Sequence, residues 1–169
     1  MKYYFKINKN SIFKYLVKEI LTLVIVFLVV ILFNYNINNS KSLETYFFTF
    51  IFLGFIYLIP LFLIFFNHYY KSKNVILIFD KDLKEFTYFG NNEKIIFRVD
   101  EVYKVNLYLT PAGYKNSFDI SYYQKYKYYK IIFLNKKEVN ISCLICDNLE
   151  LFFTEEKIKR KKKFLPLIN

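Results

Sequence analysis

Hydrophobic side chains gather in two long uncharged runs in the N-terminal half of the chain. The first run covers residues 20–33 with Thr22 as its one polar interruption, and the second covers residues 45–66. Roughly 20 consecutive apolar residues in a helix cross the hydrocarbon core of a bilayer. The pattern therefore predicts two transmembrane helices, over about 13–34 and 45–67.

The connection between these runs, NYNINNSKSLE, is short and polar, so the helices are expected to form an antiparallel hairpin. Five lysines occur up to Lys18 and one, Lys41, occurs in the connection. The positive-inside rule then predicts a multi-pass protein of the cytoplasmic (inner) membrane with both termini in the cytoplasm. A cleaved signal peptide is disfavoured because the connection lacks a small-residue cleavage pattern. Two buried helices of a soluble protein are disfavoured because little chain is left to cover them.

From residue 74 onward the pattern changes to short β-type runs separated by turns. Gly90–Asn92 and Asn135–Lys137 each lie between two such runs, which is typical of β-hairpins. The segment from Thr110 to Ser121 contains Pro111 and Gly113 and is predicted to be a loop. We expect six strands in an antiparallel meander, over 75–80, 85–89, 93–97, 102–109, 126–134 and 138–143.

The end of the chain differs from the strand region. Asp147 can cap a short helix in which Leu149, Phe152 and Phe153 share one face. This amphipathic helix is expected to close one open end of the sheet. A basic tail over 157–169 follows, in which six of the seven residues from Lys157 to Lys163 are basic.

A meander, a hairpin and a capping helix in this order, with FRVDEVYKVNLYL, YYKIIFLNKKEVNISCL and DNLELFF, resembles the small bacterial pleckstrin-homology-like (PH-like) domains attached to transmembrane hairpins. The resemblance implies an α+β membrane protein: an N-terminal two-helix transmembrane hairpin, then a small antiparallel β barrel or sandwich with a short C-terminal capping helix. The family implies a membrane-associated scaffold or binding module without catalytic residues. The expected organisation is a basic N-terminus over 1–12, the hairpin over 13–70, the PH-like domain over 74–156 and the tail.

The net charge of +11 makes basic segments the main candidates for binding. Lysines next to a membrane gain about 1 kcal/mol each near an anionic leaflet, and Phe164 can enter the interface. The same tail can instead be a solvated segment, or can dock on acidic protein or RNA. The candidate residues in it are Lys157, Lys159, Arg160, Lys161, Lys162, Lys163 and Phe164.

A second candidate is the stretch SYYQKYKYYK over 121–130, with Lys125, Tyr126 and Lys127, which interleaves aromatic and basic side chains. Such a pattern is typical of segments that contact the head-group zone of a membrane. It also occurs in segments that bind nucleic acid, which is the less favoured of these two functions. The favoured interpretation is a strand with one buried tyrosine face. Cys143 and Cys146 form a CxxC pair, but four zinc ligands are lacking and burial of both thiols is favoured over a metal or redox role.

Catalytic signatures are absent from the sequence. One histidine and three glycines leave no His-based triad and no glycine-rich phosphate loop. We therefore expect a non-enzymatic, membrane-anchored PH-like module, without cofactor or metal, that binds a protein partner or the anionic inner leaflet. The alternative is a structural subunit of a larger membrane complex, and an enzyme is the weakest hypothesis. A second copy of the chain is a further candidate partner, and nucleic acid is disfavoured.

Overall fold

The first strand of the protein pairs with a strand that begins about seventy residues later, and a helical hairpin fills the interval. The computed structural model describes residues 1–37, 43–90, 93–115 and 125–168. Strand β1 (Lys2–Phe5) pairs antiparallel with β2 (Ile76–Asp80), with Lys2 opposite Asp80 and Phe5 opposite Leu77. The N-terminal residues are therefore part of the β domain.

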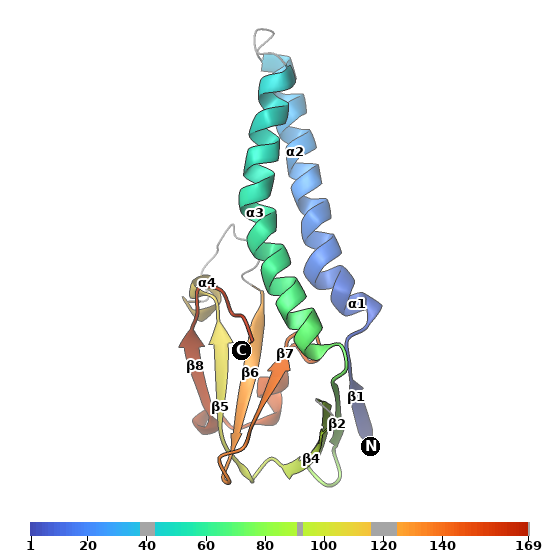
Figure 1. The fold of residues 1–169 in the computed structure, drawn as a ribbon, viewed down its shortest axis with the longest axis vertical. Coiled ribbons are helices and arrows are strands. Elements are labelled where there is room, and N and C mark those ends of the chain that lie inside the picture. Colours follow the sequence, from blue (N-terminus) through green and yellow to red (C-terminus); the bar gives the residue numbers. More distant parts are fainter. Residues whose placement is uncertain (38–42, 91–92, 116–124, 169) are drawn as a thin grey trace.

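The helical hairpin rises from this pair of strands (Figure 1). A short α1 (Lys9–Ile12) is capped by Asn8, whose side chain accepts a hydrogen bond from the Ser11 amide. A π-helical stretch (Phe13–Val17) leads into α2 (Lys18–Ile37), and α3 (Leu43–Ser72) returns to the domain. Pro60 lies inside α3 without ending it.

The β domain consists of two four-stranded sheets. The first has the order β1-β2-β3-β4 and is completed by β3 (Glu85–Gly90) and β4 (Glu93–Arg98). The second has the order β7-β6-β5-β8. It is formed by β5 (Val102–Leu109), β6 (Lys127–Phe133), β7 (Glu138–Ser142) and β8 (Ile158–Lys162).

The two predicted hairpins are confirmed. Gly90 pairs with Glu93 between β3 and β4, and Ile132 pairs with Glu138 between β6 and β7. Lys136, in the turn between β6 and β7, has a φ of 64°, which is the left-handed conformation that such turns require. Part of the predicted loop is a helix, α4 (Pro111–Lys115), while residues 116–124 lie outside the described part of the chain.

Aromatic rings fill the space between the two sheets. Phe86 is fully buried and lies 4.6 Å from Phe79 and 5.3 Å from Phe97, measured between ring centroids. Phe152 and Phe153 pack on the same ring from the chain that follows β7. The apolar positions that alternate along the strands therefore form one core.

Short helical segments are present where the capping helix was predicted, as two 3-10 turns, η2 (Leu149–Phe152) and η3 (Glu155–Lys157). The prediction that Asp147 caps this helix is wrong. No side-chain cap hydrogen bond forms at the start of η2, and the Asp147 carboxylate accepts a hydrogen bond from Tyr15 of the hairpin instead.

No helix in the described residues is long and apolar enough to cross a membrane. The predictions of a transmembrane hairpin and of an integral, multi-pass protein of the inner membrane with cytoplasmic termini are therefore wrong. Part of the second apolar run serves the junction with the β domain, where Leu61, Ile64 and Phe65 are buried together with Tyr15, which precedes the first run. At about 1.5 Å per residue, residues 20–33 cover roughly 20 Å, less than the hydrocarbon core of about 30 Å.

Candidate functional site at the hairpin base and the basic edge strand

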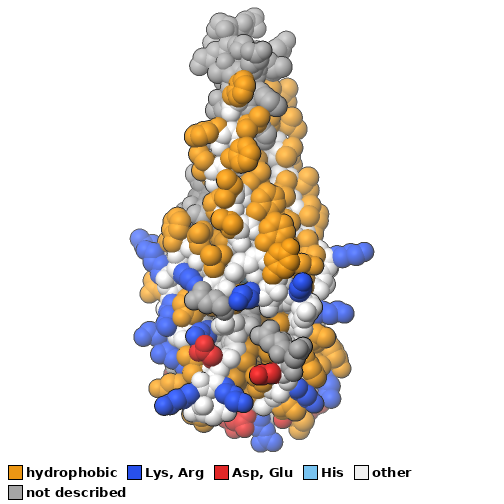
Figure 2. All heavy atoms as spheres, in the orientation of Figure 1, with side chains coloured by type: hydrophobic (Ala, Val, Ile, Leu, Met, Phe, Trp, Pro, Cys, Tyr) orange, Lys and Arg blue, Asp and Glu red, His pale blue; other side chains and the backbone are white. Residues whose placement is uncertain are grey.

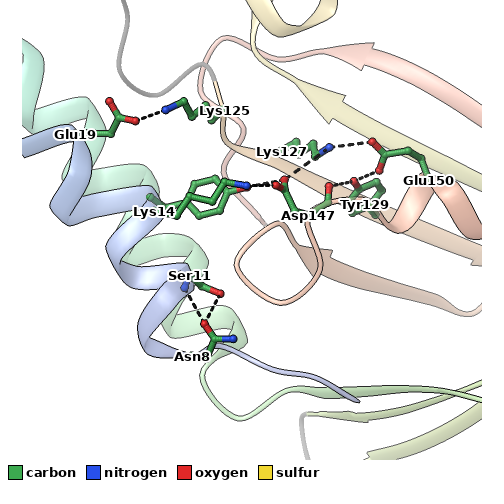
Figure 3. A network of polar contacts seen from close by, with 10 residues as sticks. Asn8, Ser11, Lys14, Glu19, Lys125, Lys127, Tyr129, Asp147 and Glu150 are labelled. Atoms are coloured by element: carbon green, nitrogen blue, oxygen red, sulfur yellow. Dashed lines mark hydrogen bonds and ion pairs between the residues drawn. The ribbon is translucent and has the colours of Figure 1, made fainter. Parts of the chain in front are cut away.

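Polar side chains from the hairpin and the β domain meet around Asp147 (Figure 3). Its Oδ1 accepts a hydrogen bond of 2.6 Å from the Tyr15 hydroxyl, and its Oδ2 accepts one from Lys14 Nζ. Burial alone would raise the pKa of Asp147, but the bonds from Lys14 and Tyr15 and the charge of Lys127 outweigh it and lower that pKa. The carboxylate is therefore charged at neutral pH and joins the hairpin to the sheet.

Lysines on β6 and next to it extend this network. Lys127 Nζ lies 2.9 Å from Glu150 Oε1 and 3.8 Å from Asp147 Oδ1, and its side chain is only 15% exposed. Lys125 forms an ion pair with Glu19 of α2, a carboxylate that is almost fully buried. These two candidate lysines are thus committed to acidic partners within the chain.

Tyr126 lies between Lys125 and Lys127 and is fully buried. Its hydroxyl donates a 2.7 Å hydrogen bond to the Tyr15 carbonyl oxygen, and the two rings lie 5.2 Å apart. His68 of α3 packs edge-on against the same ring at 5.5 Å. The structure therefore places Tyr126 in the contact between the hairpin and the β domain.

His68 is buried and satisfied on both ring nitrogens. Nε2 lies 2.7 Å from the Pro166 carbonyl oxygen and Nδ1 lies 2.8 Å from Ser142 Oγ. A carbonyl can only accept, so Nε2 carries the proton and Nδ1 accepts from the Ser142 hydroxyl. Burial lowers the pKa of His68 to about 4, which keeps the ring neutral at physiological pH.

Cys143 and Cys146 are both free and buried, in line with the favoured interpretation of the CxxC pair. Burial raises the pKa of Cys143 to about 11 and that of Cys146 to about 12. Within the described residues, no group of three or more His, Cys, Asp or Glu side chains is placed to hold a metal ion.

The basic tail contributes the edge strand of the second sheet. Lys157 Nζ donates to the carbonyl oxygens of Val99 at 2.8 Å and Asp100 at 3.1 Å, so it fastens the start of the strand. The remaining candidates follow in two groups. Lys161 and Lys163 lie over the rings of Tyr108 and Tyr128, whereas Lys159, Arg160, Lys162 and Phe164 are exposed.

The structure thus separates the predicted site residues into two places. Lys125, Tyr126 and Lys127 belong to the junction, and the residues from Lys157 onward belong to β8 and the segment behind it. Tyr15, Glu19 and His68 of the junction are missing from the sequence prediction. These three residues have only a weak signal in the sequence. They stand next to the apolar runs, but the sequence does not show that the fold buries them together.

Replacement of Asp147 by asparagine is expected to lower the free energy of unfolding at pH 7 by about 1–2 kcal/mol, the value of hydrogen bonds to charged groups in a half-exposed setting. Because the folded-state pKa of Asp147 is lowered, its contribution is present at neutral pH and is lost as the pH falls through that pKa. Urea unfolding at pH 7 and pH 3 should show a difference from the wild type that narrows in acid.

Asp82 provides the matched control for this measurement. It is a fully exposed carboxylate that pairs with the N-terminal amine, so Asp82→Asn should not reproduce the effect. Equal stability of Asp147→Asn and the wild-type protein at pH 7 would contradict a structural role for the network.

Comparison with known proteins gives one clear relationship. A family model described as PH domain matches residues 2–152, a range that includes β1, the helical hairpin and all strands up to β7. No curated protein matches the chain at a significant level, and no solved structure does so either. PH domains are in general binding modules without catalytic activity. The match extends over most of the 169 residues, and the chain therefore belongs to the PH domain family.

Proposed function

We propose that this PH domain is a non-enzymatic protein-binding module whose partner covers the outer faces of α2 and α3. The observation that supports the proposal is the exposure of large apolar side chains along the hairpin (Figure 2). Phe48 is 70% exposed and Phe52 is 67% exposed. Contiguous apolar patches larger than a few hundred Å² are rare on soluble monomers and mark interaction sites.

The exposed positions have the spacing of a helix-docking surface. On α3 they recur every three or four residues and so lie on one side of the helix: Phe48, Phe52, Phe55, Ile56, Ile59 and Leu63. On α2, Leu21, Ile25, Leu28 and Leu32 have the same spacing. Ridges of this kind fit into the grooves of apolar helices in a partner protein.

Charge at the foot of the hairpin favours a partner other than a second copy. Lys18, Lys71 and Lys73 are exposed there, and the chain as a whole carries +11. Two copies side by side would bring like charges together, which costs free energy. A partner with an apolar helical groove and an acidic rim complements both features, since interfaces commonly combine an apolar centre with a polar edge.

Photo-crosslinking in native cells tests this proposal directly. A photoreactive residue at Phe55, which is 62% exposed on α3, is expected to yield adducts with a protein of different sequence. The same residue at Leu151, which is 79% exposed on the β domain, serves as the matched control and should yield few. Adducts with lipid alone, or with further copies of this chain alone, would contradict the proposal.

A further inference from the structure

Strand β8 is the outermost strand of the second sheet (Figure 1) and has no described strand on its far side. It pairs parallel with β5, with Val105 opposite Ile158 and Leu109 opposite Lys162. A strand at the edge of a sheet presents unpaired backbone N–H and C=O groups to its surroundings. The free side of β8 can therefore accept one more strand.

The pairing shows which amides of β8 face outward. The Lys163 amide donates to the Leu109 carbonyl oxygen at 2.8 Å, and amides two residues apart point to the same side of a strand. Lys161 and Lys159 therefore turn their backbone groups toward β5. The backbone groups of Arg160 and Lys162 point away from the sheet.

The charge of β8 is not balanced inside the described chain. Five lysines elsewhere pair with carboxylates, namely Lys2, Lys14, Lys125, Lys127 and Lys130. Across the described residues, Lys159, Arg160 and Lys162 form no ion pair with any carboxylate, and all three are exposed. Successive side chains alternate between the faces of a strand, so cations lie on both faces of this edge.

We propose that an acidic, extended segment of a partner protein adds to the free edge of β8 as a further strand. Its backbone bonds to the outward amide and carbonyl groups of Arg160 and Lys162, and its carboxylates meet the cations on both faces. This inference rests on the proposed function only in that the partner is a protein. The contact is separate from the apolar hairpin, so the two can be tested apart.

Synthetic peptides titrated into the full chain provide the test. A fluorescent eight-residue Glu–Val peptide, Glu-Glu-Val-Val repeated twice so that carboxylates lie on both faces of the strand, is expected to bind, as followed by anisotropy, while the peptide with Lys in place of Glu is not. A Glu–Pro peptide with Pro in place of each Val has equal charge but lacks half of the backbone donors on each edge of the strand, so it should bind at least about tenfold more weakly. Equal binding of the Glu–Val and Glu–Pro peptides would overturn strand addition.

Two variants of β8 separate backbone from charge. Arg160→Pro removes an outward amide but none that faces β5, and Arg160→Glu with Lys162→Glu reverses the charge. Each is expected to reduce Glu–Val binding by about tenfold or more. Lys94→Glu, an exposed lysine on β4 at the edge of the other sheet, should leave it unchanged. The proposal would be overturned if the double variant had the far-UV circular dichroism spectrum of the wild type and bound the Glu–Val peptide equally well.

The remaining outcomes identify other ligands. Vesicles of phosphatidylcholine with phosphatidylserine that bind through β8 while the Glu–Val peptide does not would overturn the proposal in favour of lipid. Lysines on an edge strand also protect it against aggregation. If no acidic peptide binds, the proposal is overturned and protection against aggregation is the role that remains for the lysines of β8. Peptide binding without protein adducts at Phe55 would reject the hairpin proposal and leave this one standing.

Discussion

Replacement of Tyr126 by alanine is expected to lower the free energy of unfolding by about 3–5 kcal/mol, the range for removal of a buried aromatic side chain. Tyr126 is fully buried and contacts Tyr15 and His68 from the two ends of the hairpin. The substitution leaves a cavity where α3 and the π-helical stretch meet β6. Urea unfolding followed by circular dichroism measures the loss.

Two control variants define the origin of this effect. Tyr126→Phe keeps the ring and removes only the hydrogen bond to the Tyr15 carbonyl oxygen, so it should cost about 1 kcal/mol. Tyr103→Ala truncates a tyrosine that is 65% exposed on β5 and should change little. A similar loss for Tyr103→Ala and Tyr126→Ala would show that the packing of the junction does not determine stability.

Acidification is expected to destabilise the protein through His68. Its pKa is about 4 in the folded protein and about 6.5 in an unfolded chain, so the unfolded state takes up the proton first. The stabilisation is complete above pH 6.5 and is lost as the pH falls from 6.5 toward 4. The loss should reach about 2 kcal/mol at pH 5 and about 3 kcal/mol below pH 4.

The neighbouring groups around His68 do not titrate between pH 6.5 and pH 4, so the change in stability there is assigned to the histidine. The charge of Lys163 lowers its pKa further, whereas burial raises the pKa values of Cys143, Tyr126 and Tyr128 and keeps them neutral. His68 is the single histidine of the sequence, so its imidazole signals in an NMR titration are unambiguous. His68→Gln should remove most of the change in stability between pH 7.5 and pH 5, and an unaltered pH profile of this variant would contradict the prediction.

Local pattern was sufficient to predict the strands that pair with near neighbours. Alternation and turn residues located β2 to β7 because each signal lies within about ten residues. They missed β1 and β8. Lys2–Phe5 pairs with a strand on the far side of the hairpin, and the run after Lys157 looks like a solvated tail until β5 is seen beside it. Pairing between distant segments leaves no periodic signal of its own.

The apolar runs predicted approximately where α2 and α3 lie in the sequence, but they did not predict what surrounds these helices. The apolar run that suggested a membrane helix includes Leu61, Ile64 and Phe65, which pack on the domain. In the candidate site, the charge of the region after Lys157 was evident from the sequence. The burial of Tyr126 and the pairing of Lys125 with Glu19 depend on tertiary contacts that a lysine–tyrosine pattern does not specify.

The hairpin is attached to the domain at two adjacent points, because β1 leads into α1 and α3 leads into β2 while β1 and β2 pair with each other. A single covalent link would let the helices swivel, whereas two neighbouring links act as a clamp that fixes their direction. A mechanical load applied to the far end of the hairpin would therefore reach the β1–β2 ladder from both sides. Tilting the helices relative to the β domain would require the β1–β2 ladder to shear or open. The hairpin and the β domain should therefore reorient together as one rigid body.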